Sequence, residues 1–541
     1  MFSKATDPLF LRWREESDDA TKAKLDAMSN SEAADAFGAL PSFGTGGLRN
    51  PEGIGPNRIN LITIRWAAAA LARSLTAIGK KGPVLIGYDT RHHSRAYAEE
   101  ATFTLNRYDI PVVLFDEPTP VPLLSFALKR GNYLGGVMIT ASHNEPTDNG
   151  FKVYDPNGAQ YIPTQTKILE QYIQALDPFS IRPLKKSESL QKGLFHITGK
   201  AEKAAYLSAI APIHAPTDLS VVATPLHGAA FRLLPDALKR SGHKVTLPTE
   251  QMNIDGRFFT VKAPNPEDPK VFQIAERLGR QCNADLLLAT DGDGDRCGCC
   301  IKKKNDYIPL SGNDTAALLL YYLTNRKKYP LPPNGYVART AVSGTLGTSI
   351  AQKAGLKTIL VPTGFKYIGA AATEKANGTF FAGYEESGGF LYGDHAADKD
   401  GIATAVLLAE AAAYYKKQGK MLFDIQEELH SLYGREYSET LRFFFPGSDG
   451  LARRKACLEY FRQFTPVNSK KSSCGDTVFF DFGADKKAAL RLSGTEPYLK
   501  LYCIVKAGKD AAARGKMEAI QAEILPIIDR FLSLTPQKAE Y

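Results

Sequence analysis

The sequence is poor in cysteine: it has seven in 541 residues, and an odd number of thiols cannot all pair. Reduced thiols are typical of a cytosolic protein rather than of a disulfide-stapled secreted one. Cys297, Cys299 and Cys300 are close in sequence, but no second Cys/His pair at finger spacing follows them, which argues against a zinc site. We therefore expect a cytoplasmic protein in which these cysteines lie on a buried strand.

The sequence also lacks an uncharged apolar run of membrane-spanning length. Residues 402–415 form the longest apolar stretch, but they are rich in alanine and include Glu410, so they predict a buried helix. The N-terminus soon becomes charged, unlike a signal peptide. The densest basic cluster, Lys302–Lys304, is followed by Asn305 and Asp306, as in a solvated hairpin turn. We expect neither a membrane nor a nucleic acid as a partner.

What the sequence does contain is an ordinary globular composition, with 44% apolar and 23% charged residues. The length predicts roughly three or four domains, and the net charge of +9 fits an anionic substrate. Apolar strands that end in polar, glycine-containing loops alternate with helices, which predicts repeated α/β units with mixed or parallel sheets. Such strands are expected at 219–223, 285–290, 336–341, 358–362 and 379–384.

The two ends of the chain differ from this pattern. Residues 7–40 are polar with a helical periodicity, which predicts a helical extension that packs on the first domain. From about residue 433 aromatic and β-branched residues increase, which predicts a smaller α+β domain. We therefore expect a helical extension, three α/β domains and one α+β domain, at residues 1–40, 41–205, 206–310, 311–432 and 433–541.

A serine stands where α/β sheets place their chemistry, at the end of a strand. The apolar run at 137–139 predicts a buried strand, small polar residues follow around Ser142, and Pro146 and Gly150 indicate a loop after it. His143 and Lys152 are nearby candidates for proton transfer or anion binding. Taken alone, the stretch is equally typical of a Ser/Asn-rich turn.

Another polar segment, residues 89–94, follows a strand expected at 83–88. Its adjacent histidines would point to opposite faces of an extended segment, so they rarely share one metal ion. We favour Arg91 and Ser94 as groups that position the serine loop.

Three carboxylates at alternate positions, Asp291, Asp293 and Asp295, follow a strand at 286–289. Hard oxygen ligands of this kind suit Mg²⁺. An EF-hand loop is excluded, because its sixth position would be Arg296 rather than glycine and its twelfth would be lysine rather than glutamate. The sequence predicts a magnesium site at this loop.

Two further loops carry groups that bind phosphate. The three glycines of 43–49 let backbone amides approach an anion that Arg49 can grip, although the segment is not a dinucleotide fingerprint. Arg491, Ser493, Gly494 and Thr495 combine a guanidinium, two hydroxyls and exposed amides into a phosphate cradle.

Taken together and in this order, the motifs resemble those of the α-D-phosphohexomutases, which include the phosphoglucomutases and phosphomannomutases. T-A-S-H-N followed by N-G-F-K resembles the family's active-serine loop, and D-G-D-G-D-R its metal loop. R-L-S-G-T-E-P is similar to the family's phosphate loop, with Leu492 where many members have proline. The resemblance covers residues 43–497.

The resemblance implies three related α/β domains and a smaller α+β domain around one cleft. It implies interconversion of glucose 1-phosphate and glucose 6-phosphate, through a phosphorylated Ser142 and a hexose 1,6-bisphosphate. Mg²⁺ would be held by the three aspartates and an oxygen on the phosphorylated serine, with glucose 1,6-bisphosphate as activator. The partner would be a small hexose phosphate, and the protein a monomer or homodimer. Phosphomannomutase or dual activity, and less readily phosphopentomutase activity, are alternatives.

The resemblance also indicates which residues contact the substrate. Glu385 and Ser387 would share one face of an extended segment and grip two sugar hydroxyls, while Glu386 supports structure. His395 and Lys399 match the phosphoglucomutase branch. The full expected set is Arg49, Arg296, Thr363, Gly364, Glu385, Ser387, Lys399, Arg491, Ser493, Gly494 and Thr495.

Three other functions fit less well. A serine hydrolase would need G-x-S-x-G, and a nucleotide kinase G-x-x-x-x-G-K-[ST]; the sequence has neither. A chain that only binds sugar phosphate is disfavoured by the presence of Ser142 and all three aspartates.

Overall fold

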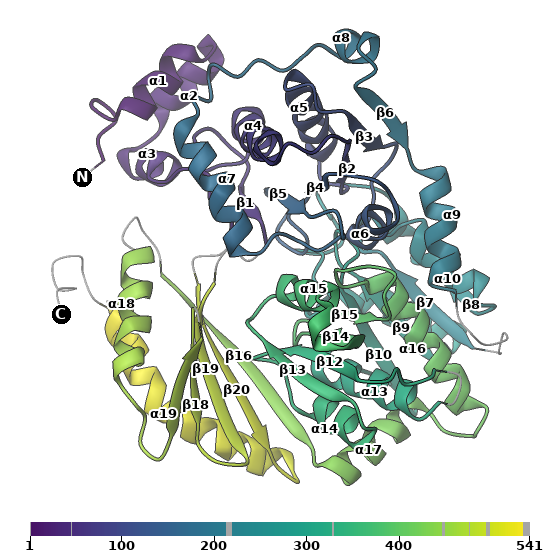
Figure 1. The fold of residues 1–541 in the computed structure, drawn as a ribbon. Helices are drawn as coiled ribbons and strands as arrows, with labels where there is room; N and C mark the ends of the chain where they lie inside the picture. The colour runs from purple at the N-terminus through teal and green to yellow at the C-terminus, as the bar shows by residue number, and fades with distance from the viewer. Residues whose placement is uncertain are drawn as a thin grey trace. The chain divides into compact units, whose positions relative to one another are not determined.

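The computed structural model describes residues 2–44, 46–211, 219–326, 329–445, 450–474, 476–493 and 498–533 (Figure 1). Contacts within the chain divide it into two compact units. The larger unit comprises residues 40–343 and 347–426, and it contains three sheets. The smaller unit comprises residues 1–39, 344–346 and 427–541, and it contains the fourth sheet.

The first sheet has six strands in the order β1-β5-β4-β2-β3-β6. From β4 through β2 and β3 to β6 the neighbouring strands run parallel, whereas β5 is antiparallel to both β4 and β1. All residues of β2 and β4 are buried, as in parallel strands covered by helices. The strands are β1 (Leu48–Pro51), β2 (Val84–Tyr88), β3 (Val112–Phe115), β4 (Gly135–Ile139), β5 (Asp148–Tyr154) and β6 (Phe195–Thr198).

Five helices accompany this sheet, and α5 and α6 both pack on β2 and β4. Helix α4 is long and apolar enough to cross a membrane by length and composition, but 61% of it is buried in the protein, where it packs against α5 and α7. The helices are α4 (Leu61–Ile78), α5 (Ser94–Arg107), α6 (Val121–Arg130), α7 (Pro163–Ala175) and α8 (Lys186–Gln191).

The second sheet has the order β11-β10-β9-β7-β8. Cys297, Cys299 and Cys300 are buried on β10 and unpaired, which confirms the predicted buried strand. The strands are β7 (Ser220–Thr224), β8 (Lys244–Thr246), β9 (Leu286–Thr290), β10 (Cys297–Lys303) and β11 (Asp306–Pro309). The helices are α9 (Lys200–Ala209), α10 (Leu233–Arg240), α11 (Thr249–Met252), η1 (Pro269–Phe272) and α12 (Gln273–Cys282).

The third sheet has the order β13-β12-β14-β15. Its long helix α16 is buried almost throughout, as predicted, and it packs on α10, β9 and β10 of the second sheet. The strands are β12 (Gly335–Thr340), β13 (Lys357–Val361), β14 (Thr379–Tyr384) and β15 (Phe390–Tyr392). The helices are α13 (Gly312–Thr324), α14 (Leu346–Lys353), α15 (Phe365–Thr373), η2 (Lys375–Asn377), α16 (Gly401–Lys416) and α17 (Leu422–Tyr433).

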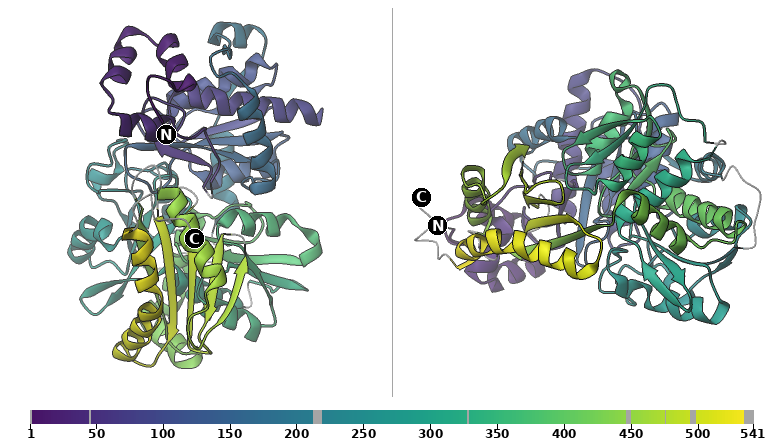
Figure 2. Two further views of the ribbon diagram at one scale, coloured as in Figure 1. Left: turned by 90° about the vertical axis from the view of Figure 1, so that its left-hand side faces the viewer. Right: turned by 90° about the horizontal axis from the view of Figure 1, so that it is seen from below.

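The smaller unit has an antiparallel sheet in the order β16-β20-β19-β18-β17. Helices α18 and α19 pack on it, and Figure 2 shows α19, in yellow, lying along the strands. This is the predicted α+β domain, so the expected class of three α/β units and one α+β unit is confirmed. The elements are β16 (Glu436–Phe444), α18 (Gly450–Gln463), β17 (Lys470–Cys474), β18 (Thr477–Asp481), β19 (Lys486–Leu492), β20 (Tyr498–Lys506) and α19 (Asp510–Ser533).

The N-terminal extension is helical, as predicted. It consists of α1 (Pro8–Glu16), α2 (Asp19–Ala27) and α3 (Asn30–Phe37), each with an Asp or Ser side chain capping its first turn. The rings of Phe10 and Trp13 pack edge-on against Phe37 and join α1 to α3. That the extension packs on the first α/β domain stays a prediction.

Candidate active site

Ser142 follows β4 in a left-handed backbone conformation, with φ of +54°. A non-glycine residue in this region is strained and is held there by its surroundings. Its backbone N–H donates to Thr140 Oγ1 at 2.7 Å, and the residue is buried. The strand end therefore presents one serine in a fixed geometry.

Arg91, in the loop after β2, binds the backbone of the serine loop through its guanidinium. Its guanidinium donates to the backbone carbonyls of Ser142 at 2.9 Å, Asn144 at 2.7 Å, Glu145 at 2.6 Å and Asp148 at 2.8 Å. This contact agrees with the expectation that Arg91 positions the loop.

Ser94 also contributes to the same region. Its hydroxyl donates to Asp89 Oδ1 at 2.6 Å and accepts from Asn149 Nδ2 at 3.1 Å. Asp89 in turn accepts from Arg91 Nε at 3.2 Å. Ser94 is thus joined to the loop through two buried polar side chains.

The serine hydroxyl faces the acidic loop that follows β9. Ser142 Oγ donates to Asp291 Oδ2 at 2.9 Å, while Oδ1 of Asp291 accepts from the backbone N–H groups of Asp295 and Arg296, each at 3.0 Å. His143 Nδ1 lies 3.2 Å from Ser142 Oγ, so the predicted proton-transfer histidine is within reach of the hydroxyl.

The three aspartates fit a metal ion. Oxygen atoms of Asp291, Asp293 and Asp295 all lie within 4.8 Å of one another, and the three side chains are buried. Within the described residues, Oδ1 of Asp293 and Oδ1 of Asp295 are buried without a hydrogen-bond partner. Burying a carboxylate oxygen without a partner costs free energy, and a bound divalent cation would provide that partner. Carboxylate oxygens are the ligands that such hard cations prefer.

Two lysines form ion pairs with this acidic cluster. Lys152 Nζ lies 2.8 Å from Asp293 Oδ2 and 3.4 Å from Asp295 Oδ2, and Lys399 Nζ lies 2.8 Å from Asp295 Oδ2. Burial and then the neighbouring carboxylates raise the pKa of Asp291 well above its usual range. Burial opposes ionisation of Asp295 too, but Lys399 and Lys152 outweigh it and hold the pKa of that carboxyl below its usual value.

The predicted sugar-binding segment is a turn between β14 and β15, not an extended strand. The prediction that Glu385 and Ser387 share one face of an extended segment is therefore wrong, because side chains alternate only in extended backbone. Glu385 is buried and Ser387 is half-buried. Glu386 Oε2 accepts from Thr340 at 3.1 Å and from Ser343 at 3.2 Å, in keeping with the supporting role expected for it.

Other predicted residues belong to the same unit as Ser142. Arg49 Nη1 donates to Asn144 Oδ1 at 2.8 Å, so Arg49 reaches the serine loop. Arg296 Nη1 lies 3.5 Å from Glu267 Oε1. Thr363 is buried beside Gly364, which precedes α15 with φ of +115°.

The predicted phosphate cradle belongs to the smaller unit. Arg491 is buried at the end of β19, and its Nε lies 3.2 Å from Asp476 Oδ2. Ser493 follows the strand and is half-buried. Gly494 and Thr495 lie outside the described residues.

Sequence reasoning missed one buried contact near the lysines. Tyr154 Oη, on β5, donates to Asp398 Oδ2 at 3.1 Å, and Asp398 Oδ1 lies 3.5 Å from Lys399 Nζ. The run Asp-Lys-Asp at 398–400 was the available signal, since a charged run after a β-hairpin is seldom buried without function.

Comparison with known proteins identifies three consecutive domains. The families described as phosphoglucomutase/phosphomannomutase α/β/α domains I, II and III match residues 41–179, 204–304 and 311–433. A phosphoglucomutase of Staphylococcus epidermidis is 34% identical over 511 residues, or 88% of this chain and 92% of that protein. A phosphoglucomutase of Staphylococcus haemolyticus is 31% identical over 523 residues, covering 91% and 95%.

A solved structure shares the fold. It is a phosphoglucomutase/phosphomannomutase family protein from Burkholderia thailandensis, with a TM-score of 0.71 and 18% identity over 92% of this chain and 98% of that one. At this identity the likeness concerns the fold alone, and it agrees with the domain matches. The chain is therefore a member of the α-D-phosphohexomutase family, the phosphoglucomutases and phosphomannomutases.

Proposed function

We propose that this isomerase interconverts glucose 1-phosphate and glucose 6-phosphate, with Ser142 as the phosphoryl carrier and a hexose 1,6-bisphosphate as the intermediate. The observation that carries the proposal is the 2.9 Å contact of Ser142 Oγ with Asp291 inside a buried triad of carboxylates. The relatives named phosphoglucomutase support glucose phosphates as the substrate class.

In the proposed reaction, phosphorylated Ser142 transfers its phosphoryl group to the free hydroxyl of the hexose phosphate. The bond from phosphorus to Ser142 Oγ breaks, a bond to the sugar oxygen forms, and the proton lost by the sugar hydroxyl is made good by a proton delivered to Ser142 Oγ. The bisphosphate then turns in the site and returns its other phosphoryl group to the serine, so that no phosphate is gained or lost.

Asp291, Asp293 and Asp295 would hold Mg²⁺, together with an oxygen of the phosphorylated serine. When bound, the cation supplies charge neutralisation for the moving phosphoryl group. The two lysines would bind anionic oxygens of the substrate, since each ammonium already lies beside the carboxylate cluster.

The proton of the sugar hydroxyl needs an acceptor, and His143 and Lys152 are the two candidates. His143 Nδ1 lies 3.2 Å from Ser142 Oγ, whereas Lys152 Nζ is engaged by Asp293 and Asp295. The histidine is therefore favoured for proton exchange at the carrier oxygen, and the lysine for charge stabilisation.

The remaining predicted residues would recognise the substrate. Glu385 and Ser387 would bind sugar hydroxyls. Arg491, Ser493, Gly494 and Thr495 would hold the phosphate that does not react. Mannose phosphates are the alternative substrates, because the family includes phosphomannomutases.

We also propose a cytoplasmic monomer or homodimer that is activated by glucose 1,6-bisphosphate. The six cysteines whose side chains the structure describes are unpaired, which fits a reducing compartment.

The decisive experiment is a mutase assay with purified protein, Mg²⁺ and glucose 1-phosphate, with and without glucose 1,6-bisphosphate. We expect glucose 6-phosphate to form, and to form faster with the bisphosphate, because the bisphosphate rephosphorylates the serine. Failure to convert glucose 1-phosphate under both conditions would refute the proposal.

A further inference from the structure

We infer that Arg91 is a positioning residue for phosphoryl transfer: it fixes the backbone of Ser142, and the loop at 255–258 holds Arg91 in turn. The inference rests on the proposed function and deepens it, because it says how the carrier serine is kept in register with the acidic loop.

All five N–H donors of Arg91 are used inside the protein. Two on Nη1 and two on Nη2 bind the four carbonyls of the serine loop, and Nε binds Asp89 at 3.2 Å. A guanidinium with no donor left has nothing to offer a substrate phosphate. Arg91 therefore acts on the substrate only through the loop that it holds.

The held backbone decides where the serine hydroxyl points. The carbonyl of Ser142 is bound by Arg91 and its N–H by Thr140, so both sides of the left-handed residue are fixed. In this conformation Oγ meets Asp291 at 2.9 Å. Relaxation toward an ordinary backbone conformation would turn Oγ away from the carboxylate, because φ would have to change sign.

The second α/β domain supports Arg91 from the other side. The guanidinium lies over the ring of Phe258 at 5.1 Å from its centroid, and Phe258 is fully buried with φ of +49°. Gly256 approaches so closely that an added Cβ would lie 2.5 Å from the backbone nitrogen of His92 and 3.0 Å from the carbonyl carbon of Arg91. The backbone position of Arg91 and His92 thus depends on a loop of the second α/β domain.

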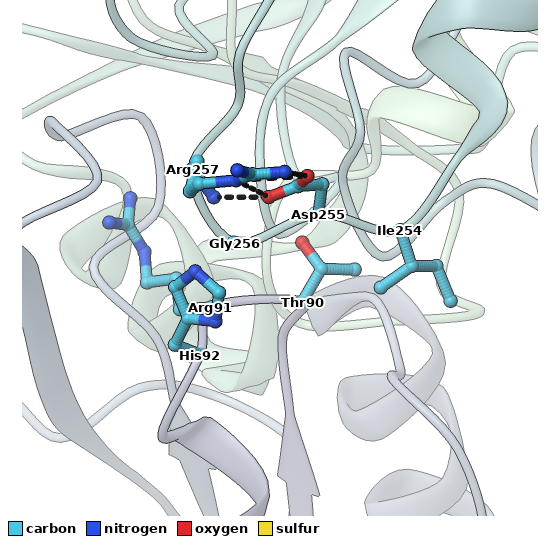
Figure 3. Close-up of a pocket in the computed structure, with 7 residues that line it drawn as sticks. All are labelled: Thr90, Arg91, His92, Ile254, Asp255, Gly256 and Arg257. Carbon is cyan, nitrogen blue, oxygen red and sulfur yellow. Dashed lines mark hydrogen bonds and ion pairs between the residues drawn. The ribbon is translucent and has the colours of Figure 1, made fainter.

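Figure 3 shows this junction. Residues 254–257 face 90–92 across a cavity of about 400 Å³, and the guanidinium of Arg91 lies to one side of the bonded pair Asp255 and Arg257. Arg257 is bound to Asp255 at 2.6 Å. The charged groups of this loop therefore pair with each other and leave Arg91 to the serine loop.

Two variants test the inference. Arg91→Lys keeps the charge but replaces a planar fork with a single ammonium of three donors, which cannot serve four carbonyls and Asp89. Gly256→Ala changes no group near the substrate and displaces the backbone of residues 91 and 92. Arg95→Lys, at an exposed arginine of α5, and Gly515→Ala, where an added Cβ meets open space, are the matched controls.

We expect kcat for glucose 1-phosphate to fall roughly 100-fold in both test variants, because displacement of a reacting group by about 1 Å has effects of that size. KM should change less than about threefold, since no substrate contact is removed. Hydrogen–deuterium exchange should become faster in the peptide spanning residues 141–149 while peptides from the smaller unit keep their wild-type rates. Both controls should behave as wild type.

Two results would overturn the inference. One is wild-type kcat and wild-type exchange in a folded Arg91→Lys protein; the other is a rise in KM with unchanged kcat, which would place Arg91 in substrate binding. If Arg91→Lys does not fold, Gly256→Ala decides on the same measurements. Failure of the proposed function is separate, because it would appear as an inactive wild-type protein, and the exchange experiment would still test the contact.

Discussion

Ser142 Oγ donates a hydrogen bond to Asp291 Oδ2 across 2.9 Å, although the serine follows β4 of the first sheet and the aspartate follows β9 of the second. Both side chains are buried, so the hydroxyl is presented to a carboxylate cluster and not to bulk water. In a phosphorylated protein, the same geometry would place phosphate oxygens beside the three aspartates. The following predictions depend on this contact and on its surroundings.

Ser142→Ala should remove nearly all mutase activity, by at least about 10³-fold, while the protein still folds, because the carrier oxygen is lost. An activity assay measures the loss of turnover, and far-UV circular dichroism measures whether the variant folds. Intact-mass and peptide mass spectrometry should locate one phosphoryl group on Ser142 in some wild-type molecules and none there in the variant. Ser187→Ala, at an exposed serine, is the control. Normal turnover in Ser142→Ala would remove the serine from the mechanism.

Asp293→Asn should weaken Mg²⁺ binding and slow the reaction, because the asparagine keeps the shape of the ligand but not its charge. Titration calorimetry with MgCl₂ measures the affinity independently of turnover, and we expect a loss of at least about tenfold. Removal of Mg²⁺ by a chelator should abolish the activity of the wild-type enzyme, and added Mg²⁺ should restore it. Asp306→Asn, at an exposed aspartate, should leave both quantities unchanged. Full activity after exhaustive chelation would contradict a metal site at 291–295.

Glucose 1-phosphate should be the best substrate and mannose 1-phosphate a poorer one. If Glu385 and Ser387 bind hydroxyls that both sugars share, discrimination must come from weaker contacts of about 1–3 kcal/mol, or roughly 10–200-fold. Comparison of kcat/KM for the glucose, mannose, glucosamine and ribose 1-phosphates measures this preference. Glu385→Ala should weaken both hexose substrates together. A clear preference for any of the other three sugars would overturn the substrate assignment and leave the mutase chemistry intact.

Acid should destabilise the second α/β domain through His243. Burial lowers the pKa of this histidine, and neither ring nitrogen has a hydrogen-bond partner among the described residues. Below the ordinary histidine pKa of about 6.5 the unfolded chain therefore binds a proton that the folded chain rejects, so stability is lost as pH falls from 7 toward 5.

His243→Gln cannot titrate, so its melting temperature should fall less than that of wild type over this range, by a difference on the order of 2 °C. Differential scanning calorimetry at pH 7, 6 and 5 measures the difference. His196→Gln, at an exposed histidine, should follow the wild type. Equal pH dependence in wild type and His243→Gln would show that other groups carry the acid sensitivity.

Much of the fold was predictable because buried strands have a local signature. The apolar run predicted at 285–290 is β9 at Leu286–Thr290, and the run at 379–384 is β14 at Thr379–Tyr384. The prediction of a loop around Gly150 was wrong, since β5 spans Asp148–Tyr154. Glycine and asparagine are poor strand formers. Here the segment is a strand because it pairs with both β1 and β4. The neighbouring strand is so close that an added Cβ on Gly150 would lie 2.5 Å from the carbonyl oxygen of Leu48.

The segment at 385–388 shows the opposite error. Side chains alternate only in extended backbone, but β14 and β15 form an antiparallel pair and the chain must turn between them. The alternation of side chains along one strand does not show where that strand ends and the turn begins.

The sequence by itself determined the residue types and their order: a serine after one buried strand, alternating aspartates after another, and phosphate-binding groups in separate loops. These are local properties, because a strand, a loop and a set of ligand atoms need only a few neighbouring residues. Only the tertiary structure decided that Arg91 binds four carbonyls of the serine loop, and that Lys399 meets Asp295 at 2.8 Å. Such contacts join distant segments, and their geometry depends on how whole sheets and helices pack.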